Sequence, residues 1–232
     1  TVLTCLDAVH LRVPIRTVIF GLLRLLHTLH IPAIRRKIRL LELRKREDTR
    51  SRPIKVYFLA INQAQWVYQS IYEAMANDPE FDPSVFVCNE WIALGNDANQ
   101  KLLRFFTDKG MNVVQRLDYS DLPDVVFFPN LDARVFGNAI DITKVYNKIL
   151  CCTLFYSMGI DNDGSFYVYQ PNFVYAWRQY VPCEFYKQLA SEKGACHGEN
   201  VVCSGSPKSD SIHTSSGSCP IWKQDRTRCK RI

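Results

Sequence analysis

The sequence predicts an α/β protein with a doubly wound, mostly parallel sheet, preceded by an amphipathic, basic helical arm. Residues 54–66 read IKVYFLAINQAQW, a continuous apolar strand followed by a polar turn and the start of an amphipathic helix. Further apolar runs of strand length alternate with helical patterns, and this alternation is typical of parallel sheets. Basic residues concentrate before the first strand, so the chain divides into an arm at 1–53, a sheet domain at 54–213 and a tail at 214–232.

Charge is distributed unevenly along the 232 residues, of which 47% are hydrophobic and 22% are charged. The net charge of +6 comes from the arm, which has 12 Lys and Arg residues against 4 Asp and Glu residues. The remaining residues have 17 basic and 19 acidic side chains, a balance of −2. A nearly neutral sheet domain argues against nucleic acid as a partner and for a local anionic partner of the arm.

The arm combines an apolar face with a basic segment. Residues 12–30 carry apolar side chains at helical spacing, and their charge-free run Thr17–Leu23 is far shorter than the roughly 18–20 residues that span a bilayer. The basic segment that follows contains Arg35, Arg36, Lys37, Arg39, Arg44, Lys45 and Arg46. This pattern predicts a helix that lies on an anionic membrane surface. A helix that packs on the domain with a solvated charged face is the alternative.

Six strands and three helices are expected after the arm, which ends at Pro53. The apolar runs place strands at 54–61, 84–89, 112–117, 124–128, 149–155 and 200–204. Helical patterns lie between them at 65–77, 97–109 and 172–192. Gly110 and Gly194 end the last two helices, because glycine tolerates the left-handed conformation that follows a helix. The aromatic side chains of the third helix are interpreted as packing residues.

Polar side chains follow the carboxyl ends of several predicted strands, where loops line the ligand site of open α/β sheets. The amides and the tryptophan after the first strand suit a hydroxyl-rich ligand, and a lysine after the last strand suits phosphate. The predicted binding residues are Asn62, Gln65, Trp66, Asn130, Tyr156, Gly159, Lys208 and Asp210. The alternatives are a helix cap for Asn62, a core position for Trp66 and plain turns for the others.

No motif fixes the catalytic chemistry. The sequence lacks the glycine-rich loops of dinucleotide and P-loop sites, and its nine cysteines show neither a C-x-x-C pair nor zinc spacing. Neither a cofactor nor a metal site is therefore predicted. An odd number of scattered cysteines favours a reducing cytoplasm. The candidates for a catalytic group are Tyr156, His197 and His213, of which the two histidines flank the last predicted strand.

Four segments together carry a resemblance to a known family. They are KVYFLAINQAQWVYQSIYEAMANDPEFDPSVFV, DVVFFPN, LFYSMGI and ENVVCSGSPKSDSI, and they cover roughly residues 54–212. In this order and spacing they resemble the CDP-glycerol glycerophosphotransferase-like proteins, which are the polymerases of teichoic acids and capsules. The resemblance is in the order of the segments, since no single segment is diagnostic.

The resemblance implies one half of a GT-B transferase, in which two Rossmann-like domains enclose the active site. The amino-terminal domain serves the acceptor, and the second domain binds the donor, CDP-glycerol or CDP-ribitol. Such enzymes are peripheral proteins on the cytoplasmic face of the cell membrane, where they transfer a polyol phosphate to a lipid-linked polymer and release CMP. The implied acceptor residues are Asn62, Gln65, Trp66 and Asn130. The implied cleft residues are Tyr156 and Gly159, with Lys208 binding phosphate.

Two departures from the family affect the expected chemistry. The well-studied polymerases carry an H-G-T-P motif after the fifth strand, whereas residues 154–159 read LFYSMG and contain no histidine. Residues 214–232 are interpreted as a linker and the start of a second domain, so this chain by itself is expected to be inactive. Two alternatives stay open: a nucleotide-sugar glycosyltransferase of the same fold, and a non-catalytic module that docks on a membrane.

Overall fold

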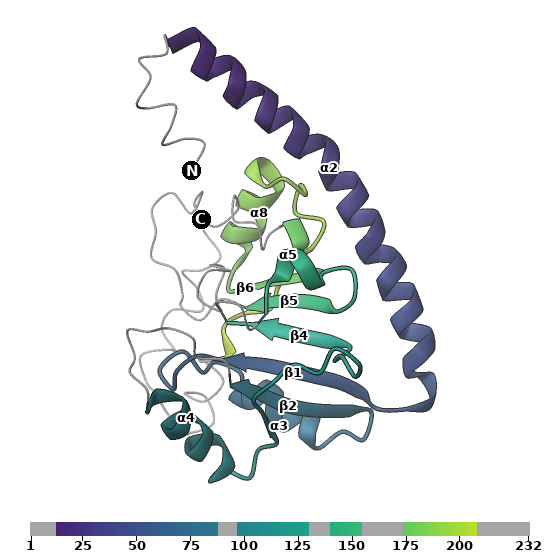
Figure 1. The fold of residues 1–232 in the computed structure, drawn as a ribbon, viewed down its shortest axis with the longest axis vertical. Coiled ribbons are helices and arrows are strands. Elements are labelled where there is room, and N and C mark those ends of the chain that lie inside the picture. The colour runs from purple at the N-terminus through teal and green to yellow at the C-terminus, as the bar shows by residue number, and fades with distance from the viewer. Residues whose placement is uncertain (1–12, 88–96, 130–139, 155–173, 208–232) are drawn as a thin grey trace, which may run out of the picture.

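The computed structural model describes residues 13–87, 97–129, 140–154 and 174–207, with side chains from residue 30 onward (Figure 1). The helices are α2 (Val13–Asp48), α3 (Gln69–Ala76), α4 (Ala98–Thr107), α5 (Ile142–Val145) and α8 (Glu184–Lys193), with a 3-10 turn at Thr49–Ser51. The strands are β1 (Ile54–Ala60), β2 (Phe81–Val87), β3 (Val113–Val114), β4 (Val125–Phe128), β5 (Leu150–Leu154), β6 (Arg178–Val181) and β7 (Val201–Cys203).

These strands form one seven-stranded sheet in the order β3-β2-β1-β4-β5-β6-β7. Every neighbouring pair is parallel. The chain adds β2 and β3 on one side of β1 and then returns to add β4 on its other side, where Val56 pairs with Val125. This arrangement confirms the predicted α/β fold with a Rossmann-like parallel sheet.

Both faces of the sheet are buried, which explains why β1 is apolar along most of its length. Val56, Phe58 and Ala60 point to one face, where they pack with side chains of α3 and α4. Tyr57 and Leu59 alternate with them and pack on the other face with side chains of α5. Alternate side chains of a strand point to opposite faces, and helices on both faces leave neither side of a parallel sheet exposed.

The strand β6 was not predicted, and the expected helix over 172–192 is wrong in its first half. Residues 178–181 form β6, and the helix α8 spans Glu184–Lys193. Pro182 lies between them; it lacks an N–H group and disfavours a helical conformation of the residue before it. The short helix α5 was also missed, and α3 begins at Gln69 rather than at residue 65.

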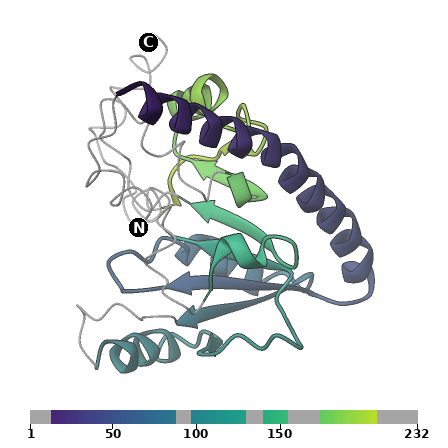
Figure 2. The ribbon, with the colours of Figure 1, turned by 45° about the horizontal axis from the view of Figure 1, so that its top comes forward.

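Helix α2 lies across the edge of the sheet at which the strands begin, on the side opposite to the arrowheads (Figures 1 and 2). The contacts of α2 agree with this position, because each residue that α2 binds lies just before the start of a strand. Lys45 binds Asp124 before β4, Arg35 binds Ala176 before β6, and Arg39 binds Glu199 before β7. The second half of the predicted arm thus packs on the sheet domain.

The helix α2 is continuous, although Pro32 lies inside it. The sequence predicted an amphipathic part followed by a basic part, and the structure joins the two in one helix. Its inner side is apolar: Ile38 and Leu41 are buried, and Ile31 packs against Val174 and Cys196. Among the described helices, none has the length and apolar character needed to cross a membrane.

Candidate functional site

The strand order reverses between β1 and β4, so the carboxyl ends of these two strands lie side by side. In open α/β sheets, ligands bind at this point, because the loops that leave the two strands diverge there. Asn62, Gln65 and Trp66 follow β1 directly. The structure therefore brings the first three predicted binding residues to the edge of the sheet where a ligand is expected.

Asn62 forms the turn that leads out of β1. Its side-chain oxygen Oδ1 accepts a hydrogen bond from the backbone N–H of Gln65 at 2.9 Å. The N–H of Trp66 donates to the carbonyl of Gln63 at 3.1 Å in the same turn. Asparagine favours such turns, because its short side chain can replace a backbone acceptor. Asn62 therefore stabilises a turn and does not cap a helix, since α3 begins at Gln69.

Gln65 is the polar side chain at this edge with unsatisfied hydrogen-bonding capacity. Its oxygen Oε1 is buried and accepts no hydrogen bond from the residues that the structure describes. A buried acceptor without a donor costs about 1–3 kcal/mol. Gln63, two residues earlier in the same turn, is exposed. A hydroxyl group of a ligand can donate to Gln65 Oε1 and remove this cost.

Trp66 packs in the aromatic core beneath the turn. Its ring lies 4.5 Å from that of Phe106 and 5.3 Å from that of Tyr68, centroid to centroid, in edge-on contacts. Its indole N–H donates to Gln69 Oε1 at 3.0 Å. Such aromatic contacts fix the position of the turn that carries Gln65. Trp66 therefore holds the site in place.

The other predicted site residues lie outside the described residues. They are Asn130, Tyr156, Gly159, Lys208, Asp210 and His213, together with the tail at 214–232. His197 is described, and it is exposed in the turn before β7. That turn lies at the amino edge of the sheet, so His197 and Gln65 are at opposite ends of the strands.

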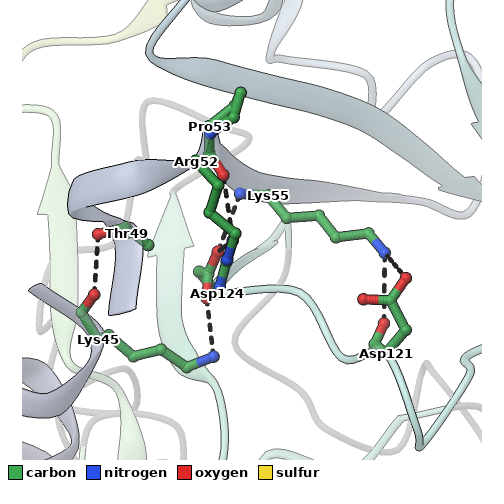
Figure 3. A network of polar contacts seen from close by, with 7 residues as sticks. All are labelled: Lys45, Thr49, Arg52, Pro53, Lys55, Asp121 and Asp124. Atoms are coloured by element: carbon green, nitrogen blue, oxygen red, sulfur yellow. Dashed lines mark hydrogen bonds and ion pairs between the residues drawn. The ribbon is translucent and has the colours of Figure 1, made fainter. Parts of the chain in front are cut away.

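A buried ion cluster at the amino edge was not predicted (Figure 3). Asp124 is 1% exposed and accepts hydrogen bonds from Lys45 at 2.7 Å, from Arg52 at 2.6 and 2.9 Å, and from the backbone N–H of Lys55 at 3.0 Å. Burial by itself raises the pKa of Asp124, but these donors outweigh burial and lower it to about 2. We call these four residues the Asp124 cluster. It connects the end of α2 to the starts of β1 and β4.

The basic residues of α2 whose side chains the structure describes separate into two groups. Arg35 and Lys45 are half-buried, and both bind residues of the sheet domain. The exposed group consists of Arg36, Lys37, Arg39, Arg44 and Arg46. Leu40 and Leu43 are exposed among these cations. Neither leucine packs in the core of the domain. We call Arg36, Lys37, Leu40, Leu43 and Arg44 the outer face of α2.

Two adjacent cysteines, Cys151 and Cys152, lie in the core of the sheet. Cys151 and Cys152 are buried in β5, and burial raises the pKa of both thiols well above the usual value. A thiol that stays protonated is a poor nucleophile and a poor metal ligand. In the part of the chain that the structure describes, no three His, Cys, Asp or Glu side chains are grouped as metal ligands.

Comparison with known proteins adds no relative to this description. The resemblance seen in the sequence therefore stays a prediction. No family model, no curated protein and no solved structure matches the chain.

Proposed function

We propose that the protein is the acceptor-side domain of a CDP-glycerol- or CDP-ribitol-dependent transferase that adds polyol phosphate to a lipid-linked cell-envelope polymer, such as a teichoic acid or a capsule. The observation that carries the proposal is the reversal of strand order beside β1, where the buried oxygen Gln65 Oε1 has no donor among the described residues. The resemblance of residues 54–212 supplies the chemical class.

In the proposed reaction a hydroxyl of the acceptor attacks the donor phosphorus that carries glycerol. The new P–O bond forms as the pyrophosphate P–O bond breaks, and CMP leaves. Gln65 accepts a hydrogen bond from an acceptor hydroxyl and orients the acceptor for attack. An amide oxygen does not take up a proton at neutral pH, so a different group must act as the base. Tyr156 and His213 are the candidates from the sequence.

Replacing Gln65 by alanine will lower kcat/KM for the acceptor by roughly three- to tenfold, which is the value of one hydrogen bond. The measurement is CMP release by the full product of the encoding gene, with CDP-glycerol or CDP-ribitol as donor. Gln63→Ala is the matched control: its exposed side chain lies in the same turn. If the Gln65 and Gln63 variants have equal kcat/KM for the acceptor, the acceptor does not bind at this turn.

The donor is tested in the same assay with a panel of UDP-sugars. Turnover of UDP-sugars alone would keep the fold and replace phosphotransfer with glycosyl transfer. If the folded full product turns over none of these donors, the remaining interpretation is a non-catalytic domain that docks on a membrane. CMP release from CDP-glycerol or CDP-ribitol, with no turnover of UDP-sugars, is the expected result.

The proposal includes a peripheral position of the protein on the cytoplasmic face of the cell membrane. The outer face of α2 supports it, because Leu40 and Leu43 are exposed beside three cations: Arg36, Lys37 and Arg44. Apolar side chains between basic ones are typical of helices that lie in the interface of an anionic bilayer. The inner side of the same helix is occupied by the sheet domain.

Replacing both Leu40 and Leu43 by serine will weaken binding to anionic vesicles by about tenfold or more, since two leucines lose their burial in the interface. Vesicle flotation measures this. Phe185→Ser is the control, because Phe185 is an exposed apolar residue on α8 rather than on α2. Equal flotation of the wild type with neutral vesicles would contradict the electrostatic part of the proposal.

A further inference from the structure

Two adjoining cavities lie between α2 and the segments that precede β6 and β7. Their volumes are about 330 and 350 Å³, and they share Arg35, Arg39 and Glu199 in their walls. Arg36 lines the first and Arg178 lines the second. We call the two together the arginine cavity. It lies at the amino edge of the sheet, opposite to Gln65.

The arginine cavity carries an excess of positive charge. Its two carboxylates, Glu42 and Glu199, each bind one arginine: Glu42 binds Arg46 at 2.6 Å, and Glu199 binds Arg39 at 2.8 Å. Among the described residues, neither Arg36 nor Arg178 has a carboxylate within ion-pair distance. The guanidinium of Arg178 lies instead over the ring of Trp177, at 5.4 Å. The carboxylates therefore do not neutralise the cavity.

Two residues that line this cavity, Arg35 and Trp177, each hold a buried N–H donor that has no acceptor among the described residues. Arg35 uses Nη1 to bind the carbonyls of Ala176 at 2.6 Å and Val174 at 3.4 Å, but its Nε is buried and unpaired among the described residues. The indole nitrogen Nε1 of Trp177 is buried and unpaired in the same way. Buried donors are nearly always paired in native proteins. Two exceptions among the residues that line one cavity point to a ligand with acceptor oxygens.

The charges around Arg35 also favour an anionic ligand. Burial lowers the pKa of Arg35, and the neighbouring cations Arg39 and Arg178 also lower it, while Cys196 and Glu199 act in the opposite direction. A guanidinium stays protonated in proteins, so this lowered pKa expresses mainly the cost of burying the charge, and to a smaller extent repulsion by Arg39 and Arg178. An anion among them removes the repulsion and the cost of burial.

We propose that the arginine cavity binds a phosphate group. Planar guanidinium groups match the geometry of phosphate oxygens and bind them in pairs, and a cavity of this volume admits the group with part of the molecule that carries it. The source of the phosphate is either the headgroup of a membrane lipid or a soluble phosphate ester. The site is separate from the proposed acceptor site at the carboxyl edge, so each proposal is tested without the other.

Binding of glycerol 3-phosphate to the full chain tests the site, measured by calorimetry at constant ionic strength with glycerol as the uncharged probe. Saturable binding of glycerol 3-phosphate alone is expected, and Arg178→Gln will weaken it about tenfold or more. Lys37→Gln is the matched control: it removes one charge from the exposed side of α2 without touching the cavity. If Arg178→Gln does not fold, Arg39→Gln replaces it, because Arg39 is exposed, lines both parts of the cavity and lies outside the outer face of α2.

Flotation with phosphatidylglycerol vesicles distinguishes the two sources. A loss of flotation for Arg178→Gln that exceeds the loss for Lys101→Gln, which removes an exposed charge of α4 outside both the cavity and the outer face of α2, assigns the phosphate to a lipid headgroup. Unchanged flotation of Arg178→Gln, with weakened binding of glycerol 3-phosphate, assigns it to a soluble ester. The site is refuted if the wild type shows no saturable binding of glycerol 3-phosphate and Arg178→Gln floats like the wild type. If Lys37→Gln and Arg178→Gln weaken the binding of glycerol 3-phosphate equally, the site is also refuted, because the effect is then general attraction between charges.

Discussion

Asp124→Asn will lower the free energy of unfolding by about 3–5 kcal/mol, because it leaves the largely buried Lys45 without its counter-charge. The asparagine has nearly the same shape as the aspartate, so the change is one of charge. Lys45, one of the partners, is only 16% exposed in the structure and keeps its positive charge. Urea denaturation at neutral pH measures the loss. We expect the same change to loosen the attachment of α2 to the sheet, since Lys45 and Arg52 both lie at the end of the arm.

The matched control is Asp121→Asn. Asp121 forms an ion pair with Lys55 close to the Asp124 cluster, but its side chain is 69% exposed. Exposed ion pairs contribute at most about 1 kcal/mol, so this variant should unfold almost like the wild type. Similar losses for Asp121→Asn and Asp124→Asn would show that burial of the carboxylate is not the cause.

The same carboxylate predicts how stability depends on pH. The pKa of Asp124 lies at about 2 in the folded protein, compared with 3.8 for the free side chain. Because the folded pKa is the lower one, the unfolded chain binds the proton first, and the stabilisation is complete above about pH 4. It is lost as the pH falls from about 4 to 2, and it amounts to about 2 kcal/mol. Asp124→Asn should remove this part of the acid dependence.

Phe58→Ala will lower the free energy of unfolding by about 3–5 kcal/mol, because it opens a cavity in the largest aromatic cluster. Phe58 is fully buried in the centre of β1. Its ring lies 5.0 Å from that of Phe127, 5.2 Å from that of Tyr68 and 5.9 Å from that of Tyr72. These contacts join β1 to β4 and to the turn that carries Gln65. We therefore expect the variant to lose both stability and the position of the proposed acceptor site.

Phe185→Ala is the control for this prediction. The same ring is removed from α8, where Phe185 is 52% exposed. Substitutions at such surface positions change the free energy of unfolding by about 0.5 kcal/mol or less. Denaturation curves of the two variants should differ in their midpoints. If they coincide, Phe58 does not lie in the core that the structure describes.

The fold could be predicted because its main signals are local. Ile54–Ala60 is apolar on both faces, and the structure buries both, so one stretch of sequence was enough to identify a central parallel strand. β6 was missed because Gln179 and Arg178 interrupt its pattern. Gln179 is buried all the same, since the hydroxyl of Thr153 on β5 donates to its side chain. Only Pro182 gave a local signal against a helix.

The site was predicted less completely, for a physical reason. The Asp124 cluster joins residues that are 69 to 79 positions apart in the sequence, and no periodicity records such a pairing. Trp66 and Asn62 were identified by their position at the carboxyl edge of the sheet, but their contacts are with the protein itself. Gln65 differs from them only in its unpaired oxygen, which is a property of the folded chain. The arginine cavity depends on Trp177 and Arg178, which the sequence placed in a helix.

The position of α2 at the amino edge sets a minimum length for the acceptor under the proposed function. The outer face of α2 and the turn after β1 lie at opposite ends of the strands. The seven residues of β1 separate them by about 23 Å, at a rise of about 3.3 Å per residue. A polymer anchored in the bilayer under α2 must extend over this distance before its growing end reaches Gln65. The domain would therefore select acceptors by length. Short, newly primed chains would not reach Gln65, whereas chains already several units long would reach it.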